Sequence, residues 1–435
     1  MGIGSFAKKA AGMAFGVAGA AAGAVGAAAG AAGALAGKFG SVLGGGGGAD
    51  NLNPSFAMSL DGKPYKFSSG SSILTDAYVD YTVFDSTAGV CVIKVVNKSV
   101  KNNKNGVAVS QDFNISAGSK IQFSMGYNGK NAPIFTGYVY KVNTDVQSAD
   151  NGSADSTLTS KLTVVCIDPK WYLMVGEKSN DYAQSKTYSA VVNEVLGNQT
   201  YSQKFGGLNV NIKDEPDASN FPERVACQIK ETDFDFLKRL AVETGCLFFA
   251  DVVGALNFVS LDSPSLPKGS ISELTQDAVL GAEFETNRGN IPTSSSIVGI
   301  DPKDLNKIIS SEIKDSVPIG SGKDSDSLTK NFAGILGNIT NVGIPRPKKL
   351  VDFLSKAELN LKELHSSQAK LKLKGTPGFI LGQKIKLKPI ATVPDNEYLI
   401  TGINHTYSSS SAPNFVTTLT LNSTRSKPIK TDKKL

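Results

Sequence analysis

Short segments in which apolar and polar residues alternate fill the chain from about Asn53 onward. Before residue 170 they read DAYVDYTVFD, GVCVIKVV, KIQFSMGYNG, IFTGYVYKV and SKLTVVCID. A period of two places successive side chains on opposite faces of a strand, and β-branched and aromatic residues favour that conformation. The Asn-Gly pairs in NNKNG and GYNGKN are typical of tight hairpin turns. Residues 53–170 are therefore expected to form an antiparallel β domain.

The segment from about residue 185 to 265 has a mixed pattern. TYSAVVNEVLGN predicts a short helix, and ETDFDFLKRLAVETG predicts a longer one. In the longer helix Thr232 can cap the first turn, Asp235 can reach back as in a capping box, and Gly245 suits the C-terminal end. Two strands, CLFFADV and ALNFVSL, follow and are joined near Gly254. One apolar face of the longer helix would consist of Phe236, Leu237, Leu240 and Ala241.

The last third of the chain returns to strands. The stretch from Ile300 to Lys349 is polar and is expected to be an excursion or a flexible insertion. An amphipathic helix, LVDFLSKAELNLKELHSSQ, precedes the strand segments AKLKLKG, QKIKLKPI, EYLITGINHTYS and NFVTTLTLNS. The fold class is therefore α+β and mainly β. Its expected divisions are an Ala/Gly-rich segment and linker (1–49), a first β domain (50–175), an α/β domain (176–265) and a second β domain (266–430).

The composition fits a folded protein of about three domains. The 435 residues carry a formal net charge of +6, spread thinly along the sequence. Nucleic-acid-binding proteins concentrate Lys and Arg on one face, whereas here a basic cluster appears only in the tail KPIKTDKKL. The sequence therefore argues against specific nucleic-acid binding.

The cysteines and histidines give no pattern of a metal site. Cys91, Cys166, Cys227 and Cys246 are far apart in sequence, and three of them lie in apolar runs where reduced cysteine acts as a small core residue. His365 is expected to be exposed on its helix. His405, in the strand GINHTYS, is expected to pack or to form a hydrogen bond within the sheet. Neither a metal nor a cofactor is predicted.

Residues 12–37 contain glycines spaced by four and three residues in regular alternation. A helix over the 28 uncharged residues from Ala10 to Gly37 would be about 42 Å long with all the glycines of this series on one seam, at a cost of roughly 7 kcal/mol relative to alanine. Such a helix needs a closely packed partner, either copies of itself or helices in a membrane. A disordered tail and a signal peptide are the alternatives. The seam consists of Gly12, Gly16, Gly19, Gly23, Gly26, Gly30, Gly33 and Gly37.

The segment VACQIKETDFDFLKRLAVETGCLFFAD resembles the signature of the phage baseplate hub family, which includes late-control D proteins and the hub portion of the type VI secretion spike protein VgrG. Two further matches follow the family's order: FTGYVYKV with LTVVCIDPKWYL, and LKGTPGFILGQKIKL with YLITGINHTY and FVTTLTL. The resemblance covers about residues 55–425. Its packing or interface motif corresponds to Thr232, Asp233, Phe234, Phe236, Leu237 and Gly245.

The resemblance implies two similar β-barrel tube domains on either side of the α/β domain. It also implies a homotrimer that adapts a six-fold tail tube to a three-fold spike. The expected partners are the tube protein, a separate spike protein and a tape-measure protein, with assembly in the bacterial cytoplasm before incorporation into a virion tail or injection particle. Phe234 or Phe236 is the candidate for a subunit contact. The N-terminal glycine seam has no counterpart in the family pattern, so its role is not inherited.

Other motifs favour structural interpretations. GSGKDS lacks the upstream glycine and the hydroxyl residue of a phosphate-binding loop. Asp233 and Asp235 point in different directions on a helix, so they do not form a catalytic pair. Lysines alternate with apolar residues in AKLKLKG, which indicates a solvated strand face or a positively charged channel wall. We therefore expect a structural, non-enzymatic hub. The alternatives are a membrane-anchored or pore-forming protein that uses the N-terminal segment, and a hydrolase at a tail tip.

Overall fold

The computed structural model describes most of the chain from residue 53 to residue 425. The glycine seam, the NNKNG turn and the basic tail lie outside the described residues. The described residues are 53–65, 72–84, 87–100, 115–149, 157–182, 185, 187–217, 226–286, 294–301, 303–313, 316–322, 337–345, 347–391, 393–410 and 415–425.

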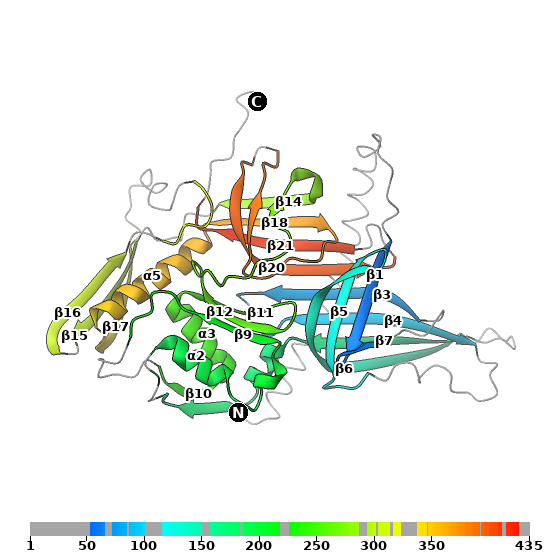
Figure 1. Ribbon diagram of the computed structural model, residues 1–435, viewed down its shortest axis with the longest axis horizontal. Helices are drawn as coiled ribbons and strands as arrows, with labels where there is room; N and C mark the ends of the chain where they lie inside the picture. The colour runs from blue at the N-terminus through cyan, green and yellow to red at the C-terminus, as the bar shows by residue number, and fades with distance from the viewer. Residues whose placement is uncertain are drawn as a thin grey trace.

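One large sheet runs across the molecule (Figure 1). It has 13 strands in the order β14-β18-β21-β20-β3-β4-β7-β6-β5-β1-β2, with β13 and β19 attached beside β20. All its pairings are antiparallel except β13 with β19. The first group of strands is β1 (Pro54–Leu60), β2 (Lys63–Tyr65), β3 (Ser72–Thr82), β4 (Val90–Val100), β5 (Lys120–Tyr127), β6 (Lys130–Ala149) and β7 (Thr157–Ile167). The second group is β13 (Glu273–Leu274), β14 (Val279–Thr286), β18 (Ser367–Lys374), β19 (Lys384–Leu387), β20 (Asn396–Ser408) and β21 (Phe415–Ser423).

The two groups of strands have the same order. In the first half of the sheet the neighbours are β3-β4-β7-β6-β5-β1, and in the second half they are β14-β18-β21-β20-β19-β13. If the six strands of each half are numbered in chain order, both halves have the spatial order 2-3-6-5-4-1. The halves meet where β20 pairs with β3, from Gly402 opposite Thr82 to Ser408 opposite Asp76. The sheet is thus an internal repeat joined along one pair of strands.

Alternation of apolar residues produces these strands as predicted. In β5, Ile121, Phe123 and Met125 are buried while the residues between them are partly exposed. The predicted turn between β5 and β6 has Asn128 at φ 51° and Gly129 at φ 80°, the left-handed conformations that an Asn-Gly hairpin requires. The mainly β fold with a large antiparallel sheet is therefore confirmed.

A smaller module between the halves has its own apolar core. Both helices predicted for this region are present, and Thr187 and Thr232 cap them by accepting hydrogen bonds from backbone N–H groups three residues later. Asp235 interacts with the Thr232 hydroxyl, whereas a capping box would place it on the backbone N–H of Thr232. The elements are η1 (Pro169–Met174), β8 (Glu177–Asn180), α2 (Tyr188–Leu196), η2 (Ser202–Lys204), β9 (Gly207–Asn211), β10 (Gln228–Thr232), α3 (Asp233–Thr244), β11 (Cys246–Ala250), β12 (Ala255–Ser260) and η4 (Gln276–Ala278), the last lying just before β14.

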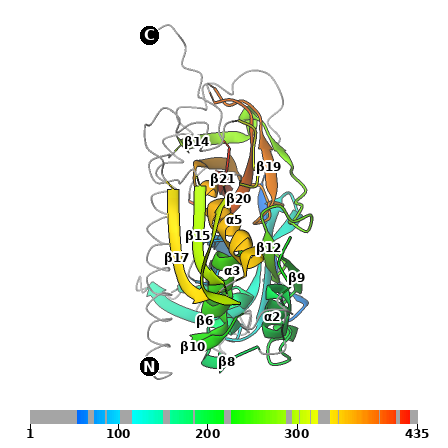
Figure 2. The ribbon, with the colours of Figure 1, turned by 90° about the vertical axis from the view of Figure 1, so that its left-hand side faces the viewer.

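Where residues 300–349 are described, they form regular strands in a separate sheet, so this part is an excursion from the main sheet and the alternative of a flexible insertion is wrong for it. β15 (Ser294–Asp301), β16 (Asp304–Ile313) and β17 (Gly337–Pro345) form a separate three-stranded sheet, and α5 (Lys348–Leu364) packs beside it (Figure 2). Ile297, Ile309, Val351 and Leu354 make the small core between them. The sequence looks polar because only one face of this sheet is covered. None of the described helices is long and apolar enough to cross a membrane.

Candidate functional site

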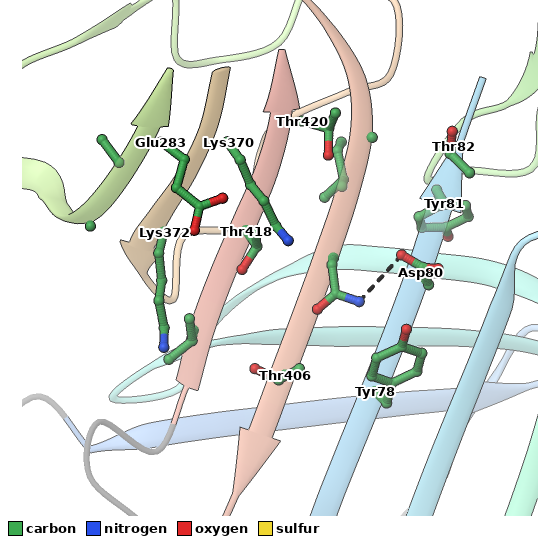
Figure 3. A pocket seen from close by; sticks show the side chains of 16 residues that line it. Tyr78, Asp80, Tyr81, Thr82, Glu283, Lys370, Lys372, Thr406, Thr418 and Thr420 are labelled. Carbon is green, nitrogen blue, oxygen red and sulfur yellow. Dashed lines mark hydrogen bonds between the residues drawn. The ribbon is translucent and has the colours of Figure 1, made fainter. Parts of the chain in front are cut away.

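The joint between the two halves of the sheet carries a polar hollow of about 830 Å³. Strands β3, β14, β18, β20 and β21 contribute its lining (Figure 3). Its functional groups include the side chains of Tyr78, Asp80, Glu283, Lys370, Lys372 and Asn404. Asp80 and Asn404 are 324 positions apart in the sequence, and the pairing of β20 with β3 brings the two halves of this lining together.

Strand alternation explains why these side chains face the hollow. In β3, Ala77, Val79 and Tyr81 are at most 2% exposed and point into the core. The residues between them therefore point to the other face, where Tyr78 and Asp80 line the hollow. In β18 the same alternation buries Ala369, Leu371 and Leu373 and leaves the lysines on the side of the hollow.

Charges of both signs alternate on this face. Asn404 Nδ2 donates a hydrogen bond of 3.2 Å to Asp80 Oδ1 across the joint. Glu283 lies directly opposite Lys370 in the β14–β18 register. Burial lowers the pKa of Lys372, the next lysine along β18. The arrangement places acidic and basic side chains next to one another on this face. Among the described residues no group of three His, Cys, Asp or Glu side chains could hold a metal ion.

Behind the hollow, His405 lies in the core as the sequence predicted. It is 2% exposed, and its Nδ1 lies 2.9 Å from Thr417 Oγ1, with the ring 5.8 Å from that of Phe415. Burial lowers the pKa of His405 to about 3, because the charged imidazolium would lose its hydration there. His405 is therefore a neutral core residue.

His365 differs from the prediction of an exposed side chain. It follows the last turn of α5, where it is half-buried, and its ring lies 4.7 Å from the ring of Phe84. Burial lowers the pKa of His365 as well. The sequence pattern of the helix could not reveal this contact, because Phe84 lies just after β3, far away in the sequence.

The motif around α3 contains a buried polar cluster. Asp233 is 3% exposed and lies 2.5 Å from Lys178 Nζ. Its other oxygen accepts a hydrogen bond of 3.0 Å from Gln228 Nε2, and Tyr201 also donates to Asp233. Tyr182 extends the cluster by donating to Gln228 Oε1 at 2.8 Å. Because every Asp233 oxygen is bonded, the carboxylate ties β8, β10 and η2 to the start of α3.

The other motif residues serve packing. Phe234, Phe236 and Leu237 are 3%, 0% and 0% exposed within the chain's own core. Both phenylalanine rings are covered mainly by the chain's own core, and a subunit contact through Phe234 or Phe236 stays a prediction. Gly245 ends α3 at φ 67°, and a Cβ there would lie 2.8 Å from the Cα of Ala357 in α5. Glycine is needed both for the left-handed cap and for the close approach of α5.

The cysteines agree with the prediction of reduced core residues. Cys91, Cys166 and Cys246 are buried and free, while Cys227 is free and exposed. Burial raises the pKa of the Cys246 thiol to about 11, and it raises the pKa values of the Cys91 and Cys166 thiols as well.

The predicted motif residues from Thr232 to Gly245 therefore lie together, in the small module. The residues of the hollow were not singled out from the sequence. A signal does exist: Tyr78, Asp80 and Thr82 occupy alternate positions of DAYVDYTVFD, and Asn404 and Thr406 those of GINHTYS. Such alternation marks an outward face, but it does not indicate that two such faces adjoin.

Comparisons with known proteins give a family and a fold. The family model described as the Alg8 N-terminal domain matches residues 87–409. Two solved structures are similar over almost their whole length. One is the 43 kDa tail protein of prophage MuSo2 from Shewanella oneidensis, at 16% identity and a TM-score of 0.54, covering 86% of this chain and 99% of that one. The other is a tail protein from Neisseria meningitidis MC58, at 11% identity and a TM-score of 0.56, covering 85% and 96%. The comparison with curated proteins finds no match.

Proposed function

The chain belongs to the Alg8 N-terminal domain family, and from the fold that it shares with two tail proteins we propose that it is a structural subunit of a phage tail or related injection apparatus. Within that apparatus it acts as the hub, a homotrimer between the six-fold tail tube and the three-fold spike. It needs no catalytic group for this role, because the work of a hub is to hold contacts in the correct symmetry.

The internal repeat of the main sheet is the observation that carries the proposal. Two halves with one strand order give each chain two similar surfaces. Three such chains around an axis present six similar units, which suits a six-fold tube on one side. The small module and the sheet of β15, β16 and β17 beside α5 occur once per chain. A ring of three chains therefore presents three copies of these parts, which gives three-fold symmetry on the other side. We take the two halves to be the two tube domains.

The polar hollow fits the inner wall of such a ring. Its charges alternate in sign along β14, β18 and β3, so the wall would not hold a polyanion tightly. This favours the solvated-face interpretation of the β18 lysines over a basic channel. The wall would let cargo pass without binding it.

The partners follow from the hub role. The tube protein contacts one end of the ring and a spike protein the other, with a tape-measure protein inside the tube. The chain is assembled in the bacterial cytoplasm and then becomes part of a virion tail or injection particle. The glycine seam of residues 12–37 is proposed to bundle with its copies in the trimer, with contact to a target membrane as the alternative role.

The assembly state of the purified chain tests the proposal. Light scattering should give a mass near three times 45.6 kDa without detergent, and the protein should not release dye from liposomes. Dye release together with a need for detergent would instead favour a membrane-anchored or pore-forming protein. Deletion of residues 1–48 should leave the trimer intact, since the main contacts are assigned to the sheet. A monomeric truncated chain would assign trimer formation to the glycine seam.

A further inference from the structure

The repeat in the main sheet holds at the level of single residues. The pairing of β6 with β7 has a bulge between Val139 and Lys141, and that of β20 with β21 has one between Ile400 and Gly402. Val139 exchanges backbone hydrogen bonds with Gly118 and Ser119, as Ile400 does with Gly382 and Gln383. Lys141 in β6 is therefore equivalent to Gly402 in β20.

The first strands of the two halves correspond in the same way. The β3–β4 pairing has a bulge between Leu74 and Asp76, and the β14–β18 pairing has one between Val279 and Gly281. The bulged residues are Thr75 in β3 and Leu280 in β14, so these two positions are equivalent. Ala77 and Ala282 each lie two residues after the bulged residue and are therefore equivalent too. The neighbouring strands give the same alignment. Cys91 of β4 is equivalent to Ala369 of β18, and the residues opposite them, Cys166 of β7 and Leu421 of β21, are equivalent as well.

The equivalence exposes two unused edges. Within the chain, β3 pairs with the part of β20 that follows its bulge, residues Gly402 to Ser408. The equivalent edges are β14 in the second half and residues 141–149 of β6 in the first. Among the described strands, β14 pairs only with β18, and this part of β6 pairs only with β7. Within the part of the chain that the structure describes, each half thus has one joint strand whose outer edge forms no strand pairing.

The apolar side chains at the β3–β20 joint are more buried than their equivalents on the two unpaired edges. At the used joint Ala77 is 2% exposed and Tyr407 opposite it is partly buried. At the equivalent places Ala282 is exposed and Val146 is 60% exposed. Apolar side chains at an uncovered strand edge mark a place where another strand pairs.

We propose that β14 of one chain pairs antiparallel with residues 141–147 of β6 in a second copy of this chain, repeating the β3–β20 joint between molecules. The equivalence fixes the register, with Ala282 opposite Val146 and Glu285 opposite Asn143. This inference rests on the proposed homo-oligomeric hub and names the surface that closes its ring. Because the two edges are different surfaces, the contact is head-to-tail, and three such contacts would close the ring of the proposed trimer.

The side chains brought together are compatible. Glu285 opposite Asn143 reproduces the Asp80–Asn404 pair, which is hydrogen-bonded at 3.2 Å within the chain. Glu283 meets Asp145, but Lys370 lies beside Glu283 and Lys161 beside Asp145 on the neighbouring strands. The row across the joint is therefore Lys-Glu-Asp-Lys, which carries no net charge.

Cysteine cross-linking tests the register. In a Cys227→Ser background, which removes the exposed thiol, the double variant Ala282→Cys/Val146→Cys should form disulfides between chains on mild oxidation. Directly opposite residues in an antiparallel pair have Cα atoms about 4.5–5.5 Å apart, within the range a disulfide spans. Gels without reductant should show covalent dimers and trimers and no larger species. The matched control Glu283→Cys/Val146→Cys is out of register by one residue, so its thiols lie on opposite faces and should not cross-link.

The outcomes separate the joint from the hub. One outcome is a trimer by light scattering in which neither double-cysteine variant cross-links, or only the control variant does. That result overturns the proposed joint and leaves the proposed function standing. A monomer that never cross-links overturns both. Cross-linking into ladders beyond three chains supports the joint and overturns the closed trimer.

A charge exchange gives a second test that does not depend on thiol geometry. Ala282→Lys alters an exposed residue, so the chain should keep its melting temperature but lose the trimer. Val146→Glu should do the same, and the double variant Ala282→Lys/Val146→Glu should restore assembly. Loss of assembly without restoration by the double variant would overturn the register.

Discussion

Asn404 donates a hydrogen bond of 3.2 Å to Asp80, although 324 residues separate the two along the chain. The bond lies where β20 of the second half of the sheet pairs with β3 of the first. It is one of the side-chain contacts that hold the two halves of the repeat together, and it borders the polar hollow.

This pair should contribute measurably to stability. Asp80→Ala and Asn404→Ala are each expected to lower the free energy of unfolding by about 1 kcal/mol, because a charge-assisted hydrogen bond is lost. The double variant should lose less than the sum, with a coupling energy of about 0.5–1 kcal/mol. Urea denaturation measures all three. Thr420→Ala, at an exposed position on the same face, is the control and should change stability by under about 0.5 kcal/mol. Strict additivity of the two variants would show that the bond is not formed in solution.

Asp233 should be the most sensitive acidic residue of the α3 motif. Asp233→Ala removes the acceptor of Lys178, Tyr201 and Gln228 inside the small module, and is expected to cost about 3 kcal/mol. Asp235→Ala, on the exposed side of the same turn, should cost about 1 kcal/mol or less, since it loses only a capping contact. Thermal unfolding of the two variants compares them directly. Equal effects would contradict the role of Asp233 as the anchor of the cluster.

Stability should fall in mild acid because of His405. Its pKa is about 3 in the folded chain, against about 6.5 when unfolded. Between these values the unfolded chain binds a proton that the folded chain does not, so stability is complete above about pH 6.5 and decreases as the pH falls toward 3. The slope is at most about 1.4 kcal/mol per pH unit. His405→Gln should flatten the loss between pH 7 and pH 5 in urea titrations. His365→Gln, at a half-buried position, should flatten it less, and an unchanged slope in His405→Gln would disprove the assignment.

The close approach of α3 and α5 at Gly245 gives a fourth prediction. Gly245→Ala places a Cβ 2.8 Å from the Cα of Ala357 and imposes a side chain at φ 67°. Gly62→Ala also has positive φ, 78°, but its Cβ would meet nothing within 4 Å. Both should lose about 1 kcal/mol from backbone strain, and Gly245→Ala about 2 kcal/mol more because α5 must shift. Differential scanning calorimetry of the pair separates strain from steric clash. Equal losses would mean that α5 accommodates the methyl group freely.

Local pattern was sufficient for most elements. The strands from β3 to β7 and from β18 to β21 follow period-two alternation, and α3 follows its Thr232 cap and Gly245 stop. These features depend on residues close in sequence, so they can be recognised without knowledge of the fold. The failures share a different cause. β15 and β16 look like a polar insertion because only one of their faces is covered, and His365 looks exposed because its partner Phe84 is far away in sequence.

The sequence by itself determined most of the strands and the helices α2, α3 and α5, since alternation, capping and turn residues act over a few positions. Only the tertiary structure decided that β20 lies beside β3, which creates the hollow and makes Asn404 a partner of Asp80. Any two strands with matching alternation can form the same ladder. The choice between them depends on which arrangement buries the most apolar surface over the whole chain, and that quantity is not contained in any single segment.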